Sequence, residues 1–121
     1  FNSFFLIIIK KILFLNNNYK KVLGPSAWTF LHTITLNYPD NPTNDHKFYH
    51  KQLFENIIHT LPCEKCSKHY QENLKKYPLD DALESKDKFV KWLIDIHNEV
   101  NKKNSKRVYS YEEVFKLYEN T

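Results

Sequence analysis

The stretch KDKFVKWLIDIHNEVNKKN, residues 86–104, decides the fold class. Apolar residues recur in it every three or four positions, which places them on one face of an α-helix. Ser85 directly precedes the stretch and has a side chain preferred at a helix N-cap. We therefore expect a long helix, and no β-α-β pattern accompanies it. Its inward side is predicted to consist of Phe89, Leu93, Ile96 and Val100.

Three helices are expected before this stretch, and the first two have candidate caps. Ser26 can cap the first, over residues 26–37, and Thr43 can cap the second, which runs to about Leu61. A turn-rich loop with two prolines separates them. The apolar face of the second helix is predicted to consist of Phe48, Leu53, Phe54, Ile57, Ile58 and Leu61.

The remaining elements are also helical. Pro62 ends the second helix and suits the first turn of a third, expected over residues 62–76 and followed by a loop. Ser110 and Glu113 form a capping box for a short helix that ends near Glu119. The sequence therefore predicts an all-α fold, a four-helix bundle plus a short fifth helix.

Composition excludes several classes of function. The 121 residues contain a single glycine, Gly24, which leaves little room for tight hairpins or phosphate loops. No G-x-G-x-x-G is present, so a dinucleotide would have to be bound without a Rossmann loop. The net charge of +4 comes from four lysines in residues 1–25, because the remaining 14 basic residues are matched by 14 acidic ones. With Arg107 as its one arginine, the chain is not expected to bind nucleic acid.

Residues 1–21 are expected to form an N-terminal extension, and residues 22–121 the domain proper. Residues 4–15 are strongly apolar, but two lysines interrupt them, so the segment is too short and too charged for a membrane span. Three interpretations of residues 4–15 remain: the remains of a signal anchor, an amphipathic helix, or a segment packed on the domain. Membrane contact is expected only through this segment. The three asparagines at residues 16–18 predict a break between this extension and the domain. Because residue 1 is phenylalanine, we expect a fragment, a processed product or an unusual gene model.

The chain has two cysteines, in the C-x-x-C sequence Cys63-Glu64-Lys65-Cys66 at the start of a predicted helix. The helix dipole and the free backbone N–H groups favour a thiolate there, and Lys65 adds a positive charge. The spacing lets a disulfide close within one turn. We expect the sulfur of Cys63 to be open to an incoming thiolate and that of Cys66 to face inward.

Zinc is the alternative use of the cysteine pair. His46 and His50 are spaced H-x3-H and could complete four tetrahedral ligands, and His69 is a further candidate. A zinc-stabilised helical adaptor without catalysis is therefore a second hypothesis. A thioredoxin-like oxidoreductase would need strands and a β-α-β unit, which the sequence does not show.

Two helical pairs indicate a cofactor pocket. Trp28 and His32 lie at i, i+4 in the first helix, and His97 and Asn101 do so in the fourth, with Asn98 adjacent. Flat rings can stack on an adenine or isoalloxazine ring, and amides and imidazoles can bond its heteroatoms. Together the pairs predict a pocket in the core of the bundle that could hold such a ring.

With these features together, the chain resembles the Erv/ALR family of FAD-linked sulfhydryl oxidases. The matching blocks are LGPSAWTFLH (residues 23–32), Tyr38-Pro39, LPCEKC (61–66) and KWLIDIHNEVNKK (91–103). Their order and separation agree over about residues 22–118. The combination of W-x3-H, C-x-x-C and H-N-x-V-N is specific to that family.

The resemblance implies a homodimer with FAD at the open end of the bundle and the first two helices at the dimer interface. Cys66 would lie next to the flavin, and Cys63 would exchange with the substrate, a protein dithiol or a thioredoxin-like protein. Electrons would pass through FAD to O2, with release of H2O2, and no metal is expected. The implied FAD-binding residues are Gly24, Ser26, Trp28, His32, Leu61, Cys66, His97, Asn98, Val100, Asn101, Lys103, Lys106, Leu117 and Tyr118.

The chain also departs from the family pattern. Many members have a shuttle cysteine pair outside the core and a structural pair near the C-terminus, and this chain has neither. Tyr111 stands near the position of one structural cysteine, and Tyr118 stands where the family usually has tryptophan. Short, shuttle-poor members occur in large DNA viruses. A virion or host cytoplasm, a mitochondrial intermembrane space and an endoplasmic reticulum all fit the resemblance.

Overall fold

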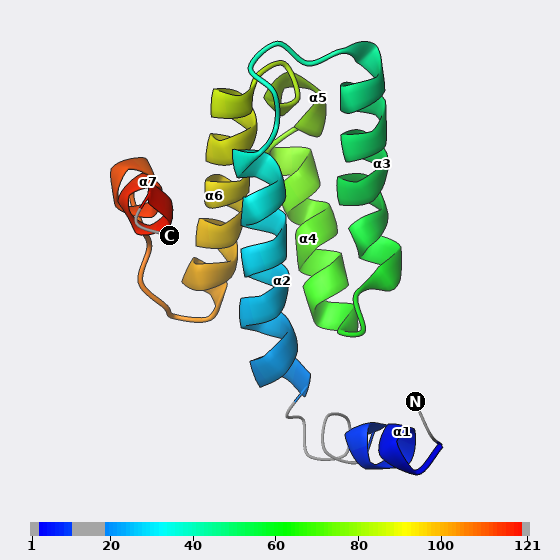
Figure 1. Cartoon of the computed structure of the whole chain (residues 1–121). Helices are drawn as coiled ribbons and strands as arrows, with labels where there is room; N and C mark the ends of the chain where they lie inside the picture. Colours follow the sequence, from blue (N-terminus) through cyan, green and yellow to red (C-terminus); the bar gives the residue numbers. More distant parts are fainter. Residues whose placement is uncertain (1–2, 11–18, 120–121) are drawn as a thin grey trace. The chain divides into compact units, whose positions relative to one another are not determined.

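The structure, a computed structural model, describes residues 3–10 and 19–119 (Figure 1). Within these ranges the chain is helical and has no strand, so the all-α prediction is confirmed. The predicted break at Asn16–Asn18 and residues 11–15 of the apolar stretch lie outside the described residues. The helices are α1 (Ser3–Lys10), α2 (Tyr19–Leu36), α3 (Asn44–Thr60), α4 (Glu64–Lys76), α5 (Leu79–Ala82), α6 (Lys86–Lys103) and α7 (Tyr111–Glu119).

The chain divides into two compact units, Phe1–Thr33 and Ile34–Thr121. The first contains α1 and most of α2, and the second contains the end of α2 and α3 to α7. None of the described helices has the length and apolar character needed to cross a membrane. The exposed large apolar residues of α1 are Phe4, Phe5, Leu6, Ile7 and Ile8.

Helix α2 begins at Tyr19, seven positions before the predicted start, with Pro25 inside it. Ser26 is therefore not an N-cap, which corrects the prediction. A proline removes one helical hydrogen bond and also clashes with the Cβ of the residue before it. That residue here is Gly24, which has no Cβ, so the helix continues through the proline. The carbonyl of Pro25 in turn accepts a 2.9 Å hydrogen bond from the Thr29 hydroxyl.

Helix α3 has the predicted cap. The Thr43 hydroxyl accepts the His46 N–H at 3.2 Å, and Nδ1 of His46 accepts the Thr43 N–H at 3.0 Å. Its predicted apolar face is only partly buried. Phe54 is fully buried, but Phe48 is 55% exposed and Leu53 41% exposed, so part of this apolar face is not covered by the rest of the chain.

Helix α4 begins at Glu64 rather than Pro62, and the loop predicted after it contains the one-turn helix α5. Pro78 stands at the N-cap position of α5, and two aspartates occupy its first turn, where negative charge favours the helix dipole. Leu79 and Ala82 bury this turn against the rest of the unit. A single turn is too short to produce a periodic pattern, so the sequence did not predict it.

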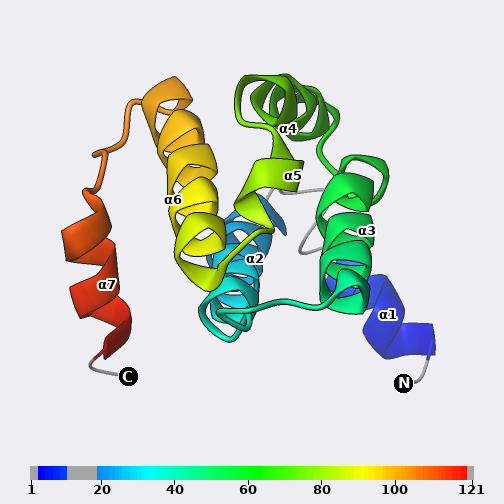
Figure 2. The same cartoon turned by 90° about the horizontal axis from the view of Figure 1, so that it is seen from above.

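Helices α3, α4 and α6 form the body of the second unit, with α5 between α4 and α6 (Figure 2). Phe89 of α6 is fully buried at its centre, with ring centroids 4.9 Å from Tyr38, 4.9 Å from Phe54 and 5.9 Å from Trp92. Ser85 caps α6 as predicted. Of the residues predicted to point inward from α6, Phe89, Leu93 and Ile96 are buried and Val100 is half-buried.

Candidate redox site

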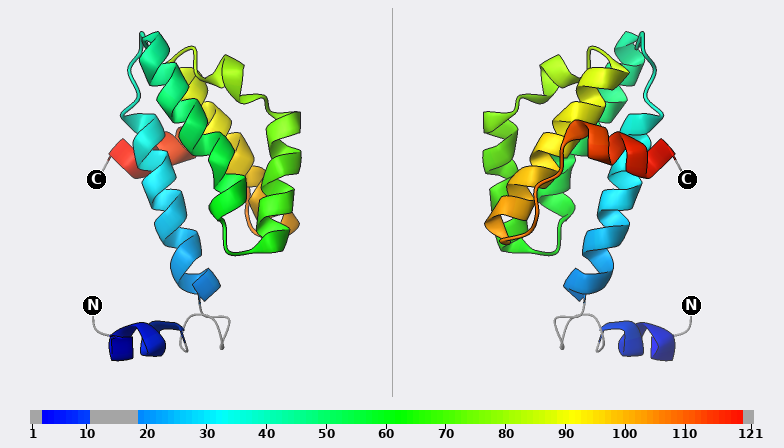
Figure 3. Two further views of the ribbon diagram at one scale, coloured as in Figure 1. Left: turned by 90° about the vertical axis from the view of Figure 1, so that its right-hand side faces the viewer. Right: turned by 90° about the vertical axis from the view of Figure 1, so that its left-hand side faces the viewer.

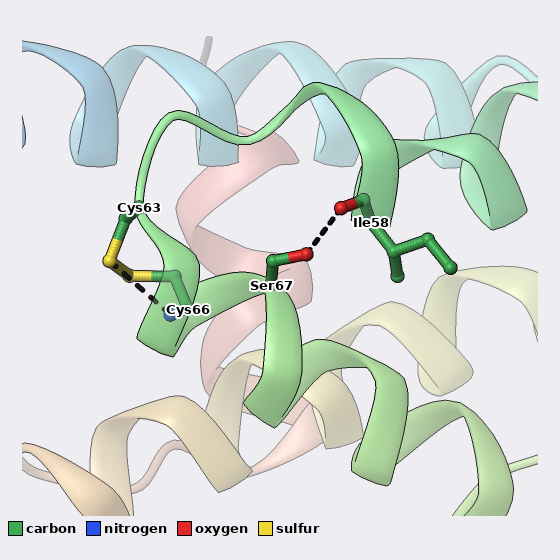
Figure 4. The surroundings of a disulfide bond; sticks show 4 residues. All are labelled: Ile58, Cys63, Cys66 and Ser67. Atoms are coloured by element: carbon green, nitrogen blue, oxygen red, sulfur yellow. Dashed lines mark hydrogen bonds between the residues drawn. A yellow bond between two sulfur atoms is a disulfide. The ribbon is translucent and has the colours of Figure 1, made fainter.

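The C-x-x-C sequence runs from the last residue of the short connection after α3 into the first turn of α4. Helix α3 ends with the Leu61 N–H donating to the Ile57 carbonyl at 3.0 Å. The Ser67 hydroxyl of α4 then donates to the carbonyl of Ile58 (Figure 4). One turn further, the buried Tyr70 hydroxyl donates to the Phe54 carbonyl at 2.5 Å. These two side-chain bonds join α4 to the end of α3 and fix the start of α4.

Cys63 and Cys66 form a disulfide with a Cα–Cα distance of 5.2 Å (Figure 4). Cys63 is the N-cap of α4, and its Sγ accepts the Cys66 N–H at 3.3 Å. Cys63 is only 7% exposed, whereas Cys66 is exposed. This reverses the expected exposure of the pair. The cap is the physical reason, because it turns the Cys63 sulfur back onto the helix end.

The position of the pair suits thiol chemistry. The first turn of α4 presents the positive end of the helix dipole, and its Cys66 N–H already donates to Sγ of Cys63; both favour a thiolate once the disulfide is reduced. Glu64 and Lys65 lie within this turn, are exposed and carry opposite charges. The stabilisation of a thiolate therefore comes chiefly from the helix itself.

His69 lies one turn beyond Cys66 on α4 and was predicted only as a zinc candidate. Its Nε2 lies 3.4 Å from Nδ2 of the buried Asn73, another turn along. Burial, and then the charge of Lys103 on α6, lower the pKa of His69. Cys66, His69 and Asn73 thus share one face of α4. The i, i+3, i+7 spacing was the signal in the sequence that could have identified them.

The C-terminal half of α6 holds the second cluster of predicted site residues. His97 is half-buried, and burial together with the charge of Lys106 lowers its pKa to about 4. The imidazole is therefore neutral near pH 7. Asn101 is buried, and its carbonyl accepts the Lys106 N–H at 2.7 Å, which folds the following loop back toward His97. Val100 is half-buried, and the side chains of Lys103 and Lys106 are exposed.

Asn98 and the two predicted residues of α7 are placed differently. Both functional groups of the Asn98 amide bond the backbone of Tyr109, just before α7. Leu117 is 65% exposed and Tyr118 is half-buried, and burial raises the pKa of Tyr118.

The predicted residues of α2 lie in the first unit. The ring centroids of Trp28 and His32 are 6.0 Å apart with a tilt of 36°, and His32 is 3% exposed. Gly24 is half-buried, and a Cβ placed on it would meet nothing within 4 Å. Ser26 is exposed, and Leu61, in the second unit, is half-buried.

The zinc hypothesis finds no support. Within residues 3–10 and 19–119, no three or more His, Cys, Asp or Glu side chains gather to hold a metal ion. His46 belongs to the capping box of α3. His50 has its Nδ1 2.7 Å from the His46 carbonyl, and its ring meets the edge of Tyr38 at 4.8 Å. Both histidines therefore have structural roles.

The Erv1 / Alr family sequence model matches residues 25–119. The chain belongs to the Erv1 / Alr family. A relative from Acanthamoeba polyphaga mimivirus, named probable FAD-linked sulfhydryl oxidase R368, is 42% identical over 99 residues, or 81% of this chain and 69% of the relative. The Arabidopsis thaliana FAD-linked sulfhydryl oxidase ERV1 is 37% identical over 95 residues, or 78% and 49% of the two chains.

Solved structures of Erv1 have the same fold as this family member. The crystal structure of the yeast Erv1 core matches with a TM-score of 0.68 and 33% sequence identity, and the match covers 73% of each chain. The chain spans about half the length of the plant relative and 69% of the mimivirus relative. The similarity therefore concerns the helical core that carries the C-x-x-C sequence.

Proposed function

We propose that this chain is a FAD-dependent sulfhydryl oxidase. It forms disulfides in protein dithiols through Cys63 and Cys66 and passes the electrons through FAD to O2, which leaves as H2O2. The observation that carries the proposal is the Cys63–Cys66 disulfide at the N-terminus of α4, in a chain of the Erv1 / Alr family. Residues 22–121 form the FAD-binding domain, and residues 1–21 lie outside it.

The chemistry of the donor set fits FAD. Trp28 and His32 supply adjacent rings for stacking, and the low pKa of His97 keeps its imidazole neutral for hydrogen bonding. Lys103 and Lys106 offer cations for a diphosphate, and their charges already act on His69 and His97. Bound FAD supplies the two-electron redox chemistry, and the chain supplies binding, orientation and electrostatics. The other proposed contacts are Gly24, Ser26, Leu61, Asn98, Val100, Asn101, Leu117 and Tyr118.

The thiol chemistry takes place on the chain itself. A substrate thiolate attacks Sγ of Cys63, which forms a mixed disulfide and releases Cys66 as a thiolate. The second substrate thiol, as thiolate, attacks the substrate sulfur of the mixed disulfide, which releases the oxidised substrate and leaves Cys63 reduced. Because Cys63 is 7% exposed, the first attack requires the connection at residues 61–63 to move. Cys66, the exposed cysteine, would lie next to FAD, as the family resemblance implies.

Single substitutions in the pair separate these roles. With Cys66→Ser we expect FAD to be retained, turnover of dithiols to be lost, and no flavin bleaching on adding a dithiol under anaerobic conditions. Cys63→Ser is the matched control, because it breaks the same disulfide but leaves the Cys66 thiolate beside FAD. A broad long-wavelength absorption from a thiolate against oxidised flavin should therefore appear only in Cys63→Ser. Full turnover in Cys66→Ser would contradict the assignment.

A homodimer is the proposed assembly. Three large side chains of α3, Phe48, Tyr49 and Leu53, are exposed, which supports an interface that includes this helix. Light scattering of the purified protein should give twice the mass of one chain, and Phe48→Glu should reduce the measured mass to that of a single chain. A single-chain mass for the parent protein would contradict the dimer.

A further inference from the structure

Helix α7 lies beside α6 without a buried side chain anywhere in residues 111–119. Val114, Phe115 and Tyr118 are half-buried, and Leu117 is 65% exposed. Figures 1 and 2 show α7 on the side of α6 that faces away from α3 and α4, and Figure 3 shows it crossing α6. Packing of a buried apolar face normally holds a short helix in place. Polar contacts must therefore contribute more to the docking of α7 than they do for a helix with a buried apolar face.

The first of these contacts is made by Asn98 of α6. Its Nδ2 donates to the Tyr109 carbonyl at 2.7 Å, and its Oδ1 accepts the Tyr109 N–H at 3.0 Å. A side-chain amide that bonds both polar groups of one residue fixes the position and the orientation of that backbone. The Arg107 guanidinium adds a contact over the Tyr109 ring, 4.6 Å from its centroid. The backbone is thus fixed two residues before α7 begins.

The second contact is made by Asp95, three positions before Asn98 and on the same face of α6. Its two carboxylate oxygens lie 2.8 and 2.9 Å from the hydroxyl of Tyr111, the first residue of α7. Partial desolvation of the phenol, followed by the bond to Asp95, raises the pKa of Tyr111 to about 12, so the phenol remains a donor in any physiological buffer. Lys91 lies over the ring, 5.7 Å from its centroid.

We propose that Asp95 and Asn98 are positioning residues that hold α7 in the place where it contacts FAD. Asp95, Asn98, Tyr109 and Tyr111 form the α7 clasp. This inference rests on the proposed function, since it takes α7 to line the cofactor. It gives Asn98 a second role beside its proposed contact with FAD, because its amide also holds the backbone of Tyr109.

The clasp would act through the population of the docked helix. When α7 is docked only a fraction of the time, the apparent Kd for FAD rises by the inverse of that fraction. If loss of either contact, Asn98–Tyr109 or Asp95–Tyr111, leaves α7 docked about one tenth of the time, FAD binding would weaken about tenfold. The same loss would expose the amides of α7 to exchange before any cofactor is present.

The experiment measures both properties in the full chain. The variants are Asn98→Ala, which removes both bonds to the Tyr109 backbone, and Tyr111→Phe, which removes the hydroxyl that bonds Asp95 but keeps the ring and its packing. Glu112→Ala is the matched control, because it breaks only an exposed ion pair with Lys116 on the same helix. Hydrogen–deuterium exchange of residues 111–119 is recorded without FAD, and the Kd for FAD is measured by flavin fluorescence.

We expect faster exchange of α7 and about tenfold weaker FAD binding in both clasp variants, and neither effect in Glu112→Ala. Unchanged exchange with weakened FAD binding in Asn98→Ala would mean a direct contact and would overturn the inference. Faster exchange with unchanged FAD binding would overturn it as well, because the clasp would then be only structural. Failure of the parent chain to bind FAD would reject the proposed function, and the inference with it.

Discussion

His97 makes the folding stability of the chain depend on pH. Burial, followed by the charge of Lys106, lowers its pKa from the ordinary 6.5 to about 4 in the folded chain. Above pH 6.5 neither state binds the proton, so the full stability is present. As the pH falls from 6.5 to 4, the unfolded chain takes up a proton that the folded chain does not, so the free energy of unfolding falls. The difference between the two pKa values corresponds to a loss of about 3 kcal/mol in the free energy of unfolding. Partial solvent access to His97 reduces this loss to about 2 kcal/mol.

Urea unfolding of the parent chain and of His97→Gln, between pH 7 and pH 4, measures this effect. Glutamine does not titrate, so the parent should lose about 2 kcal/mol more than the variant over this range. Other groups with a lowered pKa, such as Glu99 and His69, contribute equally to both proteins and cancel in the comparison. Parallel curves for the two proteins would refute the reasoning, because His97 would then titrate alike in the folded and unfolded states.

Two further predictions concern packing and capping. Phe89→Ala should lower the free energy of unfolding by about 3–5 kcal/mol, because Phe89 is fully buried among three aromatic rings, and Phe89→Leu should lower it far less. A loss below about 1 kcal/mol for the alanine variant in urea unfolding would show that this cluster is not the core. Thr43→Ala should cost about 1 kcal/mol by removing the N-cap of α3, and Thr43→Ser should restore most of it. Equal stability of both Thr43 variants would contradict the capping role.

Local signals predicted the helices well where a cap and a periodic pattern coincide. Thr43 and Ser85 cap their helices as expected, and the Ser110–Glu113 box is present, with the Ser110 N–H donating to Glu113 at 2.8 Å. Each of these caps acts over three residues and needs no knowledge of the rest of the chain. The start of α2 was missed because a proline usually limits a helix, and the glycine before Pro25 removes much of that penalty.

The candidate site was less predictable because exposure depends on the whole fold. Phe48 and Leu53 lie on the apolar stripe of α3, yet the sequence cannot tell which part of a stripe meets a neighbouring helix. Cys63 is the more buried cysteine because it caps α4, a geometry that the C-x-x-C spacing alone does not fix. The two bonds from Asn98 to Tyr109 join residues in different elements, so no local pattern could indicate them.

A visible spectrum of the purified chain, recorded while dissolved oxygen is followed after addition of a small dithiol, tests the central claim most directly. The account predicts a yellow protein whose flavin bleaches when oxygen is excluded, and which consumes oxygen and releases hydrogen peroxide when oxygen is present. A colourless protein that takes up no oxygen, even after FAD is added, would contradict it.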